Sequence, residues 1–136
     1  MEGNQMNQNR NNLTLAACVC VVMFACSCAG LYRGVVTLTA VVDEASKTYA
    51  SAYNSGLVTP DLAAKVATAH LRYRESAGVA RDALKAYKLS GDPAQFNAAL
   101  DAAKAAADAF IAAIVPLITS DKAAQLRTQI KEATRP

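Results

Sequence analysis

The residues best suited to chemistry in this 136-residue chain are its four cysteines, which all lie in one uncharged stretch, LAACVCVVMFACSCAG, at residues 15–30. They are Cys18, Cys20, Cys26 and Cys28. On one helix, at about 100° per residue, they point in four different directions, whereas zinc sites use C-x2-C pairs. No cysteine follows residue 28 to form a disulfide with the rest of the chain. The spacing therefore predicts neither a metal site nor a structural disulfide.

The cysteines lie inside an apolar run that is long enough to cross a membrane. Residues 13–32 carry no charge and follow a polar segment, MEGNQMNQNRNN. A run of about 20 apolar residues spans a bilayer, and an apolar core of about 7–15 residues is typical of a signal peptide. Arg10 and Arg33 flank the run almost symmetrically and give it no orientation. The apolar run alone leaves both interpretations open.

The stretch resembles a bacterial lipoprotein signal peptide, in which small residues precede the cysteine that receives the lipid. The usual pattern in that family is an aliphatic residue at −3, small residues at −2 and −1, and then cysteine. LAAC, ending at Cys18, has the full pattern, but polar Asn12 leaves almost no apolar core before it. ACSC, ending at Cys28, departs from the pattern at −3 and −2 but follows a full apolar core. The resemblance implies a lipid on Cys28, with Cys26 as second choice and Cys18 as third.

This resemblance divides the chain into residues 1–28, a signal peptide, and residues 29–136, an exported body. It implies a body facing the periplasm or exterior, tethered by palmitate-like acyl chains to the cell membrane or outer membrane, with membrane lipid as a partner. Ala29 follows Cys28 where an Asp commonly retains lipoproteins in the inner membrane, which favours the outer membrane. The alternative is an uncleaved single-pass anchor of a holin-like or assembly-factor protein, whose cysteines are small buried apolar residues.

After Gly34 the sequence has the periodicity of helices, with apolar residues at alternating steps of three and four. NSG at 54–56 and LSG at 89–91 are stop signals, whereas TPD at 59–61, DPAQ at 92–95 and TSD at 119–121 are start signals. In DPAQ we expect Asp92 to be the N-cap and Pro93 to be the first helical residue. Pro116 breaks or kinks the third helix. The apolar stripes run from Val35 to Ala52, Leu62 to Tyr87, Phe96 to Ile114 and Leu126 to Ala133.

These signals predict an all-α fold. Short connections favour antiparallel neighbours, so we expect an up-down bundle of three main helices, with a short fourth helix over one end or one seam. The run VVTLTAVV at 35–42 favours a strand by propensity, but no second strand is available to pair with it. Gly78, inside the second helix, costs up to about 1 kcal/mol relative to Ala and would allow a neighbour to approach closely.

The polar residues of the body form no recognisable catalytic pattern. His70, the only histidine, has no nucleophile beside it in AHLRYRE at 69–75. Asp101 and Asp108 are two helical turns, about 10 Å, apart, which is too far to share a proton or a metal. Lys104 lies between them along the helix and can pair with either carboxylate, so both are interpreted as members of ordinary surface ion pairs. Arg72, Arg74 and Arg81 of the second helix are interpreted as a solvated face that pairs with Asp82 or with the acidic third helix.

Taken together, these patterns predict a protein that is not an enzyme. The chain lacks a phosphate-binding glycine loop and the motifs H-E-x-x-H and G-x-S-x-G. The net charge of +3 is dispersed, so nucleic acid is not an expected partner. Apart from the lipid, no cofactor or metal is expected. The expected role is structural or protein-binding, with helix faces presented to a partner or to a second copy. A small-molecule carrier with a slot lined by Tyr49, Tyr73 and Tyr87 is a weaker hypothesis than tyrosines that fill the core.

Overall fold

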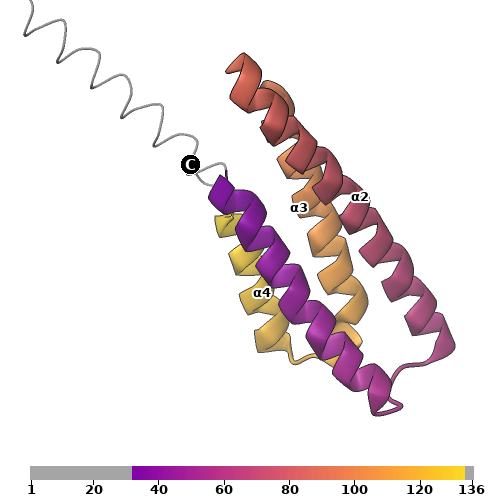
Figure 1. Cartoon of the computed structure of the whole chain (residues 1–136). Coiled ribbons are helices and arrows are strands. Elements are labelled where there is room, and N and C mark those ends of the chain that lie inside the picture. Colours follow the sequence, from indigo (N-terminus) through magenta and orange to yellow (C-terminus); the bar gives the residue numbers. More distant parts are fainter. Residues whose placement is uncertain (1–31, 134–136) are drawn as a thin grey trace, which may run out of the picture.

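The computed structural model describes residues 32–133, and these residues form four α-helices and no strand. The first helix covers residues 32–54, and it is followed by α2 (Pro60–Ser90), α3 (Ala94–Ile114) and α4 (Ser120–Glu132). A single 3-10 turn, η1 (Val115–Leu117), follows α3. Figure 1 shows the four helices alongside one another. The all-α prediction is confirmed for this part of the chain, and the β-prone run at 35–42 is helical.

The start and stop signals of α2 act as the sequence predicts. The Thr59 side chain accepts a hydrogen bond from the Leu62 N–H at 3.3 Å, and Pro60 occupies the first turn, where its missing N–H costs nothing. At the other end, Gly91 adopts a left-handed conformation with φ of 74° and donates its N–H to the Tyr87 carbonyl. The helix therefore ends where glycine relieves the steric cost of that conformation.

The start of α3 differs from its prediction by one residue. Pro93, and not Asp92, is the N-cap residue, with φ of −79° and ψ of −10°. Asp92 lies just outside the helix and accepts a hydrogen bond from the Ala94 N–H at 2.9 Å. Proline fits here because it has no N–H that would need a partner. At the far end Pro116 lies in η1, so the predicted break after Ile114 is confirmed.

One continuous apolar core receives side chains from all four helices, and α3 supplies four of its six largest fully buried side chains. Phe96, Phe110, Ile111 and Ile114 of α3 are fully buried. The predicted stripe of α3 is buried along its whole length, because the helix has neighbours on several sides. The other fully buried large side chains are Val42 of the first helix and Leu126 of α4.

Two helical glycines have opposite surroundings. A Cβ at Gly34 would collide with the carbonyl oxygen of Ala133, so the start of the first helix lies against the end of α4. A Cβ at Gly78 would meet no atom within 4 Å. Among the described residues, nothing takes up the space that Gly78 leaves. The close neighbour that the sequence suggests at Gly78 is therefore not found among residues 32–133.

This contrast predicts opposite effects of one substitution at two sites. Gly78→Ala should raise the free energy of unfolding by about 0.5–1 kcal/mol, because alanine loses less backbone entropy in a helix. Gly34→Ala should lower it by about 1–3 kcal/mol, because the helix must move away from Ala133. Urea unfolding followed by circular dichroism measures both values. Equal effects at the two sites would contradict the packing described here.

Candidate functional site

The predicted lipid-attachment residues, Cys28, Cys26 and Cys18, lie outside the described residues. Within residues 32–133, no helix has the length and apolar character needed to cross a membrane. The geometry available for a functional site is therefore that of the helical body.

The polar residues singled out from the sequence do not come together in one place. The His70 ring lies half-buried against Phe110, with the ring centroids 5.4 Å apart. Asp101 pairs with Lys104 on the same helix at 3.7 Å. Asp108 instead accepts a hydrogen bond from Arg127 of α4 at 3.2 Å. The prediction that Lys104 accounts for both carboxylates is thus wrong for Asp108. Its partner is 19 positions away on another helix, where sequence spacing gives no signal.

Two ion pairs of the described residues, Asp108–Arg127 and Glu44–Lys122, link different helices at the surface. Glu44 of the first helix pairs with Lys122 in the first turn of α4. The Lys122 ammonium also lies 3.5 Å from the side-chain oxygen of Gln125. Exposed pairs of this kind contribute about 0–1 kcal/mol each, so they affect register more than stability. Within residues 32–133, His, Cys, Asp and Glu form no group of three that could hold a metal ion.

The three tyrosines of the carrier hypothesis lie against the core. Tyr73 is buried, and Tyr49 and Tyr87 are half-buried and pack on the same cluster. The Tyr49 ring also contacts Tyr53, with centroids 6.1 Å apart. Tyrosines that fill an alanine-rich core would be packed in this way.

Among the titratable groups of residues 32–133, the buried Tyr73 has a shifted pKa. Burial raises the pKa of its phenol, because the phenolate would lose its hydration. A hydrogen bond with the Thr39 hydroxyl acts in the opposite direction. Asp43 on the first helix raises the pKa further, and Arg81 lowers it. Tyr73 of α2 is therefore a neutral phenol at neutral pH.

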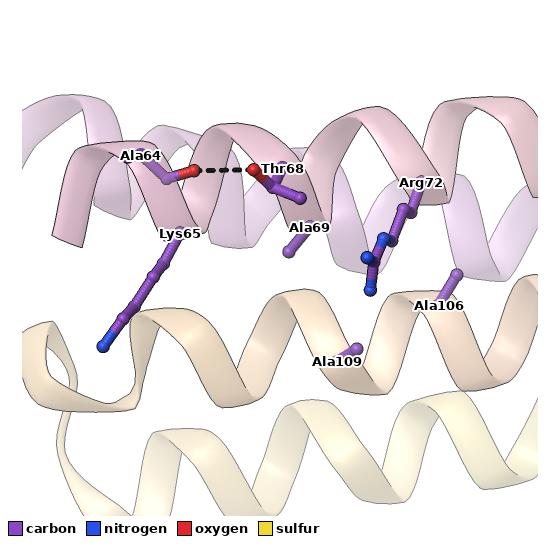
Figure 2. Close-up of a pocket in the computed structure, with 7 residues that line it drawn as sticks. All are labelled: Ala64, Lys65, Thr68, Ala69, Arg72, Ala106 and Ala109. Carbon is purple, nitrogen blue, oxygen red and sulfur yellow. Dashed lines mark hydrogen bonds between the residues drawn. The ribbon is translucent and has the colours of Figure 1, made fainter. Parts of the chain in front are cut away.

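An open hollow of about 590 Å³ lies along the outer seam between α2 and α3. Figure 2 shows that Lys65 and Arg72 reach from α2 toward α3 over a floor of small side chains. The Thr68 hydroxyl donates a hydrogen bond to the Ala64 carbonyl oxygen at 2.9 Å, so its proton is already used within the helix. The lining residues are Ala64, Lys65, Thr68, Ala69, Arg72, Ala106 and Ala109.

This hollow offers two cations and an apolar floor, which suits surface contact better than catalysis. Its lining includes no carboxylate, thiol or imidazole to act as acid, base or nucleophile. The sequence analysis assigned Arg72 to a solvated face and did not single out Lys65. The alanines of α2 and α3 make a hollow only where the two helices meet, and no sequence pattern gives that juxtaposition.

Comparison of the chain with protein-family models, with curated proteins and with solved structures found no match. The function of the chain must therefore be inferred from its own residues. Two features of those residues are informative: the cysteine-bearing apolar run before the body, and the surface that the body exposes.

The raised pKa of Tyr73 predicts how stability changes at alkaline pH. The pKa of Tyr73 is higher in the folded state than in the unfolded state, where it is about 10. The contribution of Tyr73 to the free energy of unfolding is therefore fully present below about pH 10 and is lost as the pH rises through the folded-state pKa. The free energy of unfolding should fall above about pH 10, and less steeply in Tyr73→Phe. Urea titrations at a series of pH values measure the slopes. Tyr53→Phe, at an exposed site, should keep the wild-type slope; equal slopes in all three proteins would count against this role of Tyr73.

Proposed function

We propose that the chain is a small exported lipoprotein, tethered through a lipid on Cys28, whose helical body has a structural or protein-binding role outside the cytoplasm. The observation that carries this proposal is the position of the cysteine-bearing apolar run directly before a self-contained helical body. Only residues 29–31 separate Cys28 from the first described residue of the first helix. No catalysis, cofactor or nucleic-acid binding is part of the proposal.

The short connection limits how far the body can stand from the membrane. Four residue steps from Cys28 to residue 32 reach at most about 14 Å. The first helix, residues 32–54, is about 35 Å long at about 1.5 Å per residue. A lipid on Cys28 would therefore hold one end of the body at the membrane surface. The turn at residues 55–59 would lie at the distant end.

The proposal includes an up-down order of the four helices. Gly34 lies against Ala133, whereas Glu44, further along the first helix, pairs with Lys122, earlier in α4. Residue numbers thus rise along one helix as they fall along the other, which supports opposite directions. For α3 and α4 the pair Asp108–Arg127 and the shared hollow of Lys104 and Lys131 give the same support. This order would place residues 91–93 and the end of α4 at the membrane end.

Support for a binding role comes from the surface of α2. This helix carries six basic and three acidic residues between positions 61 and 89. It also exposes three large apolar side chains: Leu71, Val79 and Leu89. Apolar side chains in a charged surface are typical of contacts between proteins, where they supply the buried centre of an interface. The proposed partner is a protein or a second copy of this chain.

The tether is tested by the intact mass of the protein extracted from membranes. We expect a chain that begins at residue 28 and carries acyl groups, and incorporation of labelled palmitate into the same species. Cys28→Ser should abolish both the shortened mass and the label. Cys20→Ser is the matched control and should leave both unchanged, because Cys20 is not a candidate attachment site.

Other masses would be equally informative. A chain that begins at residue 26 or 18 would move the lipid to Cys26 or Cys18. An unmodified chain that still begins at Met1 would overturn the lipoprotein proposal and favour the uncleaved single-pass anchor.

A further inference from the structure

The side of α2 that faces away from the core has an apolar centre. Figure 1 shows α2 at one edge of the group of helices, with α3 beside it. Leu71 and Val79 on this side are 57% and 61% exposed. Around the helix Ala67, Leu71 and Gly78 lie within about 40° of one another, and Lys85, seven residues after Gly78, continues the same line. The name outer stripe of α2 is used below for Ala67, Leu71 and Gly78.

Packing among the described residues gives no reason for a glycine at position 78 of the outer stripe. A glycine in the interior of a 31-residue helix destabilises that helix, and nothing among the described residues lies within 4 Å of a Cβ built there. Small residues on helix surfaces allow a second helix to approach closely. Gly78 therefore leaves room for a backbone that does not belong to the protomer.

The charges beside the outer stripe are sorted by sign. On a helix the residue three positions on lies about 60° to one side, and the residue four positions on lies about 40° to the other. From Leu71 these are Arg74 and Glu75, and from Gly78 they are Arg81 and Asp82. One flank of the stripe is therefore basic and the other acidic. Asp82 also pairs with the exposed Lys85 at 2.9 Å.

We propose that two copies of this chain pair through the outer stripes of α2, with the two α2 helices parallel. In a parallel twofold pair, opposite flanks meet at the same height along the axis. Arg74 of one copy then lies level with Glu75 of the other, and Arg81 lies level with the second Asp82. The two Gly78 residues come together at the centre, and Leu71 packs against its equivalent.

The sorted charges distinguish parallel from antiparallel pairing. In an antiparallel twofold pair, like flanks meet, so the acidic side faces acidic and the basic side faces basic. Like charges across an interface are unfavourable and select against that arrangement. A parallel pair also has both first helices starting at the same end, and so permits both copies to be tethered to one membrane. This last argument rests on the proposed function, whereas the charge argument does not.

The expected pair is weak in solution and stronger on a membrane. One helix from each copy buries less surface than the roughly 1,200 Å² at the lower limit of stable complexes. Tethering to one surface raises the effective concentration of each copy around the other and favours pairing without a new contact. The pairing should therefore be measured on the full-length chain in phosphatidylcholine vesicles and, at high protein concentration, in detergent.

The test uses two variants with uniform flanks. Glu75→Arg with Asp82→Arg makes both flanks basic, and Arg74→Glu with Arg81→Glu makes both acidic. Each variant alone should pair about tenfold less than the wild type, because like flanks now meet. The two variants mixed should pair with each other. Asp101→Arg with Glu132→Arg, on α3 and α4, changes the net charge by the same amount as the basic variant and should leave pairing unchanged.

Orientation is read from a photo-crosslinking amino acid in place of Ala67. A parallel pair should yield a dimer in which the crosslinked tryptic peptide is residues 66–72 of the second copy. Capture of a segment near Leu89 would show antiparallel pairing and overturn the proposal. So would the absence of any dimer, or capture of a different protein in its place. The intact mass of the same sample reports the lipid, so failure of the tether and failure of the pairing are distinguishable.

Gly78→Leu separates pairing from folding. The space at Gly78 is open within the protomer, so this variant should fold with a melting temperature at least equal to that of the wild type. Its crosslinked dimer should be lost, because a leucine side chain keeps the two backbones apart. If this variant keeps both the dimer and a normal melting temperature, Gly78 does not lie at the centre of the interface, and the proposed pairing is overturned. Ala86→Leu, elsewhere on the exposed surface of α2, is the matched control and should keep the dimer.

Discussion

The burial of α3 is the constraint on which the rest of the structure depends. Phe96, Phe110, Ile111 and Ile114 are among the few large side chains that the chain can bury completely, and all four lie on this one helix. Each contributes about 1.5–3 kcal/mol when removed from water. The other helices contribute mainly alanine, valine and leucine to the core, together with Tyr73 and Ile130. An alanine-rich chain without tryptophan therefore concentrates its core around one helix.

Close packing accounts for features that otherwise look unrelated. Gly34 is required because the first helix lies against the last residue of the described chain, Ala133. The outer seam of α2 and α3 is hollow because alanines from both helices leave it unfilled. Charged residues remain outside and form links such as Asp108–Arg127, which join helices at the surface. The core thus supplies most of the stability, and the charged residues lie at the surface.

The proposed role follows from two features of the protein, the cysteine-bearing run before the body and the exposed side of α2. The cysteine-bearing run precedes the body by only a few residues, so a lipid there would hold the body against a membrane. The side of α2 that is turned away from the core has an apolar stripe between two flanks of opposite charge. A tether at one end and a sorted helix surface along one side suit a protein that assembles on a membrane.

The sequence by itself determined the helices and their limits, because the signals are local. Capping by Thr59, the left-handed Gly91 and the break at Pro116 depend on neighbours a few residues away, and all three were predicted. The period of α3 predicted six of its eight buried residues, and it missed Ala99 and Ile111. The N-cap of α3 was misplaced by one residue, because Asp92 and Pro93 both suit a helix start and only their backbone angles distinguish them.

Which helix surfaces contact one another depends on the tertiary structure and does not follow from the sequence pattern. Asp108 pairs with Arg127 and not with the nearer Lys104, since the outcome depends on how α3 and α4 approach each other. The hollow beside Lys65 and Arg72 exists only where two helices lie together. Gly34 and Gly78 look alike in the sequence, yet one touches a neighbouring backbone and the other faces open space. Such contacts join residues far apart in the chain, and local periodicity carries no information about them.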